Sequence, residues 1–101
     1  PEMYGDLNKI INFLYDNIDF KLKISGHTDS QGSQALNLQL SKDRAENIRD
    51  YIVIFAGILE SRVELEGLGS SVPLVEENTD ADKKINRRVE FQIYREGALK
   101  K

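Results

Sequence analysis

Two charged residues, Asp29 and Arg44, stand where their charges need partners. Asp29 follows a predicted strand, whereas Arg44 lies in a segment of helical spacing, in the middle of its apolar stripe. An unpaired guanidinium directed at a core costs several kcal/mol, and its planar fork binds a carboxylate through two parallel hydrogen bonds. Together the two residues can hold a zwitterion, with Asp29 taking an ammonium and Arg44 a carboxylate. The stripe consists of Asn37, Leu40, Ile48, Tyr51, Ile52 and Phe55.

Other interpretations of these residues remain open. Arg44 can extend to the rim of the core or pair permanently with a carboxylate, for which Asp29 is the nearest candidate. His27 and Asp29 share one face of the strand, as a metal site or an acid/base pair requires, but no third ligand or nucleophile is spaced to join them. We therefore expect His27 to be a hydrogen-bonded structural residue, and we predict neither a catalytic residue nor a metal.

The elements that position these residues follow from hydrophobic periodicity. Apolar residues recur every three or four positions over residues 4–14 and 34–56, which predicts two helices, the second ending at Gly57. Alternation over residues 20–25, 63–67 and 89–93 predicts three strands, with Gly67-Leu68-Gly69 ending the second. Residues 76–84 are polar enough to hold only a short helix, and residues 97–101 should fray. This order predicts an α+β two-layer sandwich, with both main helices on one face of a small mixed sheet.

Composition bounds the function. The 101 residues fit a single domain, residues 1–101, and 14 basic against 17 acidic residues give a net charge of -3. That balance provides no general attraction for nucleic acid or anionic lipid. The chain has no cysteine, hence no thiolate metal site, and no apolar run long enough to span a bilayer. We expect no cofactor, no nucleic-acid partner and no membrane insertion by this domain.

The motif residues resemble the signature of the OmpA-like C-terminal peptidoglycan-binding domain, the family of OmpA, Pal and MotB. The resemblance begins at the end of the first strand and continues through the second helix to the last strand, with matching spacing over nearly the whole chain. The residues that carry it are Gly26-His27-Thr28-Asp29, Gly32, Asn37, Leu40-Ser41, Arg44-Ala45, Gly57-Ile58, Arg62-Val63, Gly67-Leu68-Gly69, Pro73, Asn78 and Asn86-Arg87-Arg88-Val89-Glu90.

This resemblance implies a non-enzymatic module that binds the peptide stem of peptidoglycan without covalent attachment, through diaminopimelate. In the family, the residues matching Asp29 and Arg44 hold the zwitterionic end of diaminopimelate. Residues matching Thr28, Asn37 and either Arg87 or Arg88 line the pocket, with His27, Gly32 and Asn86 supporting it. The parent would be an outer-membrane or envelope protein, anchored to the wall from the periplasm.

Two departures from the family pattern qualify the resemblance. The family usually has a strand before its first helix, whereas this chain begins at Pro1, so we expect an exposed sheet edge through which copies can pair. Asp82-Lys83-Lys84 replaces a common Gly-Arg pair, which predicts a different conformation there. Two alternatives remain: a cell-wall hydrolase using His27 and Asp29, or an assembly module of a flagellar stator or lipoprotein.

Overall fold

The computed structural model describes residues 2–95, with side chains from Gly5 onward. Its element order confirms the predicted α+β class, whereas the predicted fraying of residues 97–101 lies outside the described residues. The second helix was predicted to residue 56, and a π-helical turn, Tyr51–Phe55, completes it. The elements are α1 (Glu2–Asp16), β1 (Phe20–His27), α2 (Gln34–Asp50), β2 (Val63–Gly69), α3 (Asp80–Asn86) and β3 (Val89–Arg95).

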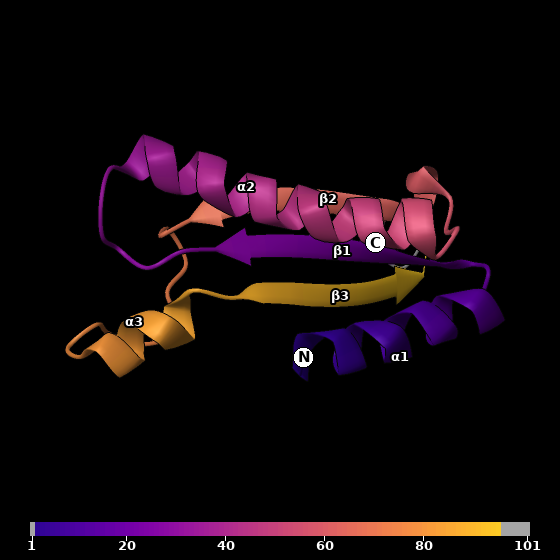
Figure 1. The fold of residues 1–101 in the computed structure, drawn as a ribbon, viewed down its shortest axis with the longest axis horizontal. Helices are drawn as coiled ribbons and strands as arrows, with labels where there is room; N and C mark the ends of the chain where they lie inside the picture. Colours follow the sequence, from indigo (N-terminus) through magenta and orange to yellow (C-terminus); the bar gives the residue numbers. More distant parts are fainter. Residues whose placement is uncertain (1, 96–101) are drawn as a thin grey trace.

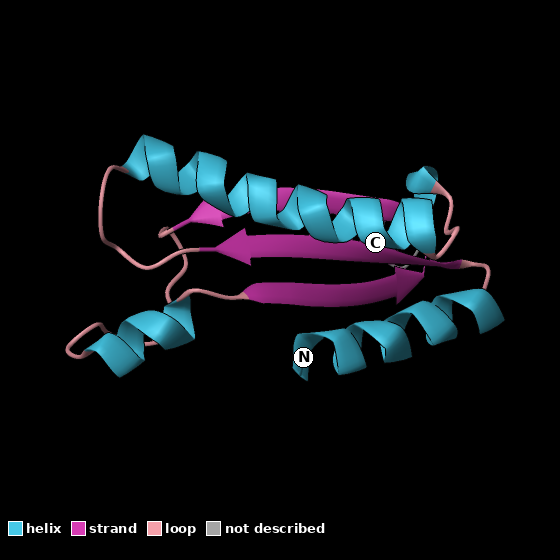
Figure 2. Ribbon diagram, viewed as in Figure 1, coloured by secondary structure: helices cyan, strands magenta, loops and turns pink. Residues whose placement is uncertain are grey.

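The three strands form one mixed sheet in the order β2-β1-β3. The central strand β1 runs parallel to β2, with Leu22 opposite Val63, and antiparallel to β3, with Ile24 opposite Phe91. Figures 1 and 2 show α2 lying along β1 and β2, α1 beside β3, and α3 at the end where β1 finishes. Within residues 2–95, none of the helices is long and apolar enough to cross a bilayer.

A single apolar core joins both main helices to the sheet. Leu22 and Ile24 point from the same face of β1 and are fully buried. Fully burying such a side chain contributes about 1.5–3 kcal/mol, so this cluster is the main source of stability. Because α1 and α2 contribute to the same cluster, they cover the same face, as predicted. The core residues are Leu7, Ile11, Leu14, Leu22, Ile24, Ala45, Ile52, Ile58 and Val63.

The buried face of α2 differs from the predicted stripe. Asn37, Ser41 and Ala45 face the sheet, while Leu40 is 44% exposed and Arg44 lies half-buried at the margin. The prediction that Arg44 stands in the middle of an apolar stripe was therefore wrong. Tyr51 and Phe55, at the other end of that stripe, are also exposed.

Glycines in the sheet explain this rotation of α2. A Cβ atom on Gly26 would lie 2.2 Å from the carbonyl oxygen of Ser41, and one on Gly67 would lie 2.5 Å from the amide nitrogen of Lys42. The helix backbone thus rests on the strands so closely that only small side chains fit between them. β2 ends at Gly69, as predicted for the Gly67-Leu68-Gly69 segment, and Gly67 lies within the strand.

Candidate functional site

The loop after β1 is held by backbone and side-chain hydrogen bonds. The amide of Thr28 donates to the carbonyl oxygen of Gly69 over 2.9 Å, and its hydroxyl donates to the carbonyl oxygen of Asp29. Gly32 has a φ of 85°, which an L side chain rarely adopts, so it makes the turn toward α2. Ser33 then caps α2 by accepting a hydrogen bond from the amide of Leu36.

Asn37 connects this loop to α2. Its side-chain amide donates to the carbonyl oxygens of Gln31 over 2.9 Å and of Asp29 over 3.4 Å. The residue is buried on the face of α2 that meets the sheet. Asn37 therefore fixes the loop that carries Asp29.

The Asp29 carboxylate is buried and charged. One oxygen accepts from the amide of Gln31 over 2.9 Å, and the other accepts from Nη1 of Arg87 over 2.6 Å. Burial alone would raise the pKa of Asp29, but the hydrogen bonds from Arg87 and Gln31 outweigh it and leave the pKa below its usual value. Asp29 is thus an ionised carboxylate held in a fixed orientation.

The adjacent arginines have separate partners. Whereas Arg87 binds Asp29, Arg88 donates through Nε to Glu90 over 2.7 Å and through Nη2 to the carbonyl oxygen of Val72 over 2.9 Å. The hydrogen bond from Arg88 keeps the pKa of Glu90 low. Arg87 is therefore the arginine that orients Asp29, and Arg88 the one that holds the loop after β2.

Asn86 is a fully buried support for that same loop. Its side-chain oxygen accepts from the amides of Leu74 and Val75, and its nitrogen donates to the carbonyl oxygen of Val75 and to the carboxylate of Glu77. These contacts use the hydrogen-bonding capacity of the amide fully. The role of Asn86 is thus to hold residues 74–77 in place.

Glu77 joins the loops that follow β1 and β2, a role that the sequence did not reveal. Its carboxylate accepts from the hydroxyl and amide of Ser30, at 2.6 Å and 3.2 Å, and from the side chain of Asn86. The Ser30 hydroxyl and then Asn86 lower the pKa of Glu77, so this contact persists at mildly acidic pH. Glu77 lies in a polar stretch with no periodicity, and no local signal marks it.

The segment with Asp82-Lys83-Lys84 forms α3. Thr79 accepts from the amide of Asp82, and the Asp82 carboxylate accepts from the amides of Thr79 and Asn78, which makes a capping box. The spacing of Thr79 and Asp82 was the available sequence signal for this helix. The segment is thus a short helix with an ordered start, and Lys84 lies within it.

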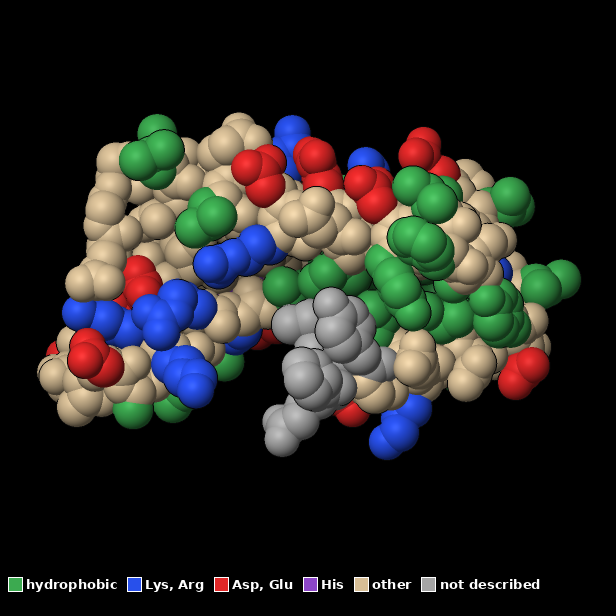
Figure 3. All heavy atoms as spheres, viewed as in Figure 1, with side chains coloured by type: hydrophobic (Ala, Val, Ile, Leu, Met, Phe, Trp, Pro, Cys, Tyr) green, Lys and Arg blue, Asp and Glu red, His purple; other side chains and the backbone are tan. Residues whose placement is uncertain are grey.

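A basic pocket lies where these elements meet. It has a volume of about 360 Å³ and includes side chains from α2, α3 and the start of β3. Figure 3 shows Lys and Arg side chains gathered at this end of the molecule, around α3 and the first half of α2. Among residues 5–95, Arg44 and Lys84 have no ion pair or side-chain hydrogen bond, whereas Arg87 and Arg88 do. The lining residues are Arg44, Lys84, Arg87, Arg88 and Val89.

Asp29 and Arg44 do not form the permanent ion pair that was one of the alternatives left open by the sequence. Asp29 is bound by Arg87, and it is Arg87 that shares the pocket lining with Arg44. Arg87 lies just before β3, and β3 pairs with β1, so its guanidinium reaches Asp29 at the end of β1. The spacing of residues along α2 gives no information about this pairing. Arg44, half-buried at the pocket, has no anionic partner among residues 5–95.

The side chain of His27 does not line the basic pocket, although its backbone amide donates to the carbonyl oxygen of Arg88 over 2.8 Å. It is 1% exposed, and its Nε2 lies 3.6 Å from a carboxylate oxygen of Glu90. Neither ring nitrogen makes a short hydrogen bond among the described residues, and Glu90, at this longer distance, is the polar neighbour of the side chain. Burial, and then the charge of Arg88, lower the pKa of His27, and they outweigh the carboxylate of Glu90, which raises it. Residues 2–95 also contain no group of three His, Cys, Asp or Glu side chains suited to a metal ion.

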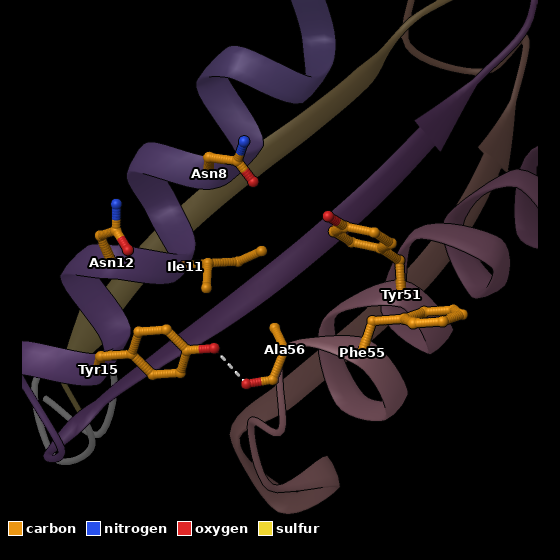
Figure 4. Close-up of a pocket in the computed structure, with 7 residues that line it drawn as sticks. All are labelled: Asn8, Ile11, Asn12, Tyr15, Tyr51, Phe55 and Ala56. Atoms are coloured by element: carbon orange, nitrogen blue, oxygen red, sulfur yellow. Dashed lines mark hydrogen bonds between the residues drawn. The ribbon is translucent and has the colours of Figure 1, made fainter.

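A second pocket, of about 380 Å³, lies between α1 and the π-helical turn (Figure 4). The hydroxyl of Tyr15 donates to the carbonyl oxygen of Ala56 and so links the two sides. The pocket presents phenol, amide and apolar groups and no charged side chain, so it lacks the ion-pairing capacity of the basic pocket. Its lining residues are Asn8, Ile11, Asn12, Tyr15, Tyr51, Phe55 and Ala56.

Comparison with known proteins places this geometry in a family. A model of the OmpA family matches residues 1–87. The chain belongs to the OmpA family. OmpA-family relatives include outer membrane porin F of Pseudomonas aeruginosa, which is 36% identical over 90 residues, 89% of this chain and 26% of that protein. Peptidoglycan-binding protein ArfA of Mycobacterium bovis is 34% identical over 93 residues, 92% of this chain and 28% of that protein.

A solved OmpA-family structure confirms the fold. The peptidoglycan-associated lipoprotein from Burkholderia pseudomallei superposes with a TM-score of 0.82 at 26% identity, over 87% of this chain and 74% of that chain. Against porin F and ArfA, this chain spans only 26% and 28% of the relative's length. The relatives named here are, by their names, outer-membrane, lipoprotein and peptidoglycan-binding proteins.

Proposed function

We propose that this OmpA-family chain binds peptidoglycan non-covalently through the diaminopimelate of the stem peptide, and thereby ties an envelope protein to the cell wall. The observation that carries the proposal is that Arg44 and Arg87, from distant segments, line one pocket, and that Arg87 also binds the buried carboxylate of Asp29. The names of ArfA and of the Burkholderia lipoprotein support the choice of ligand.

In this proposal the two charged ends of diaminopimelate have separate partners. Arg44 binds the carboxylate bidentately, because its guanidinium has no partner among the described side chains. Asp29 binds the ammonium with the lone pairs that Gln31 and Arg87 leave unused, and the low pKa of Asp29 keeps it anionic for this purpose. Thr28 and Asn37 keep the loop in position.

We further propose that the chain binds its ligand without altering it, and that it works on the periplasmic side of the outer membrane. His27 is buried and directed at Glu90, which leaves a hydrolase without its acid/base residue. A pocket of this size binds a peptide stem modestly, but many chains engaging one polymeric wall give a strong attachment.

Co-sedimentation with purified peptidoglycan sacculi tests the proposal. We expect the wild-type chain to pellet with sacculi, and both Arg44→Ala and Asp29→Asn to lose at least about tenfold in affinity, since each removes a protein charge that pairs with an opposite charge of the ligand. Asparagine is chosen at position 29 because its side-chain oxygen still accepts from the amide of Gln31.

Arg49→Ala and Asp43→Ala are the matched controls, with the same charge changes elsewhere on α2 and outside the pocket. These controls should pellet like the wild type. Circular dichroism melting must show that each variant is folded. If folded Arg44→Ala pelleted as well as the wild type, Arg44 would not bind the wall, and the proposal would be wrong.

A further inference from the structure

Only some of the cationic side chains that line the basic pocket have an anionic partner. Four of its five lining residues are cationic, and two of these, Arg87 and Arg88, are paired with Asp29 and Glu90. Arg44 and Lys84 line the same space from α2 and α3 and have no anionic partner among residues 5–95. The pocket therefore presents two uncompensated positive charges on separate elements, one more than a single carboxylate requires.

The position of Lys84 is set by local structure. The capping box of Thr79 and Asp82 begins α3, and Asn86 at the other end of α3 is fully buried and bound to residues 74–77. Lys83, one residue earlier, lies within 4.0 Å of Asp80 and does not line the pocket. Two neighbouring lysines thus differ in surroundings: Lys84 lines the pocket, whereas Lys83 does not, although its charge helps to lower the pKa of Asp29.

We infer that Lys84 is a specificity residue that binds a second carboxylate of the ligand, so that the site prefers stem peptides with two free carboxylates. The inference rests on the proposed function, in which Arg44 takes the carboxylate of diaminopimelate. The second group is then the α-carboxylate of the glutamate that precedes diaminopimelate in the stem. A wall in which that carboxylate is amidated binds more weakly.

A carboxamide cannot replace the carboxylate here. Lys84 has only hydrogen-bond donors and a positive charge, so it gains a charge-assisted bond from a carboxylate and little from a neutral amide oxygen. Because Lys84 is exposed at the rim, its contribution is modest and falls as salt concentration rises. Arg44, half-buried, has the larger share of the affinity.

The test measures binding of two synthetic tripeptides of alanine, γ-linked D-glutamate and diaminopimelate by calorimetry at low salt, with the C-terminal α-carboxyl of diaminopimelate amidated in both so that only its side-chain carboxylate is free. One tripeptide has a free glutamate carboxylate, and the other has the carboxamide. We expect the wild type to bind the free form about fivefold more tightly, the gain of one exposed charge pair. Lys84→Gln should bind both forms equally, whereas Lys83→Gln should keep the fivefold preference.

The outcomes separate this inference from the proposed function. A Lys84→Gln variant that keeps the wild-type preference, or a wild type that binds both tripeptides equally, would overturn the role of Lys84 and leave the proposed function intact. A wild type that binds neither tripeptide and does not pellet with sacculi would overturn both. Lys84 is exposed, so its substitution should leave the melting temperature unchanged.

Discussion

The two ends of the sheet are packed with different kinds of side chain. Where β1 begins, α1 and the last turns of α2 enclose leucine and isoleucine side chains, whereas the buried residues where β1 ends are polar. Polar groups in a core must each find a partner, which fixes their geometry but adds little net stability. The first end therefore stabilises the domain, and the second positions a site. The buried polar residues are His27, Thr28, Asp29, Asn37, Ser41 and Asn86.

Leu14→Ala should have the largest effect on stability. Leu14 is fully buried in the apolar core, so truncation should lower the free energy of unfolding by about 3 kcal/mol. Urea unfolding measures the loss, and Leu59→Ala, at a side chain 69% exposed, should change it by less than about 0.5 kcal/mol. Well below its melting temperature, Leu14→Ala should still pellet with sacculi. If the folded variant no longer bound the wall, the apolar end of the sheet would contribute to binding as well as to stability, contrary to this comparison.

Gly26→Ala should affect both ends, because Gly26 lies where α2 presses on the sheet. The new Cβ would lie 2.2 Å from the Ser41 carbonyl oxygen, a backbone atom, so α2 must shift. We expect a loss of about 2 kcal/mol in unfolding free energy, together with weaker wall binding as Asn37 moves with α2. Gly5→Ala is the control, since a Cβ there meets nothing within 4 Å and alanine favours the helix. Equal stability of the two variants would mean that the close contact is not required.

The smallest effect should come from pH at His27. Its pKa is lowered in the folded state, so the unfolded chain takes up a proton first as the pH falls through about 6.5. Stability is therefore full above that pH and declines below it, by about 0.5–1 kcal/mol between pH 7 and pH 5.5. His27→Leu should remove this decline without loss at pH 7, because it replaces a buried imidazole that has no hydrogen-bond partner among the described residues. An unchanged decline in His27→Leu would assign it to other groups. Asp29, whose lowered pKa lies below its usual value of 3.8, acts only at much lower pH.

Sequence periodicity predicted the fold well because most elements bury one face. Alternation located β1 and β3, and helical spacing located α1 and α2. It failed on the rotation of α2, because the face that meets the sheet is chosen by glycines of β1 and β2 and not by the largest apolar residues. A hydrophobic pattern indicates which side chains gain free energy from burial, but it does not indicate how closely two backbones approach.

The site could be predicted only in part for the same reason. Asp29 and Arg44 were both selected from the sequence as charged residues of a site, but the partner of Asp29 comes from 58 positions away along the chain. Arg87 reaches it through the antiparallel pairing of β1 and β3, in which Gly26 lies opposite Val89. Neither this contact nor the bond from Glu77 to Ser30 has a local signature, because both depend on tertiary register.

The loop after β2 has a consequence for the rates of binding. Residues 72–77 are held by Arg88, by four hydrogen bonds of Asn86 and by Glu77 on Ser30, so this loop is already ordered in the free chain. A ligand that meets an ordered loop loses little conformational entropy on the protein side, and no slow closing step precedes or follows its capture. Each attachment can then form and break quickly. If the chain binds the wall as proposed, a protein held by many such brief attachments can be redistributed as the wall grows, without ever being fully released.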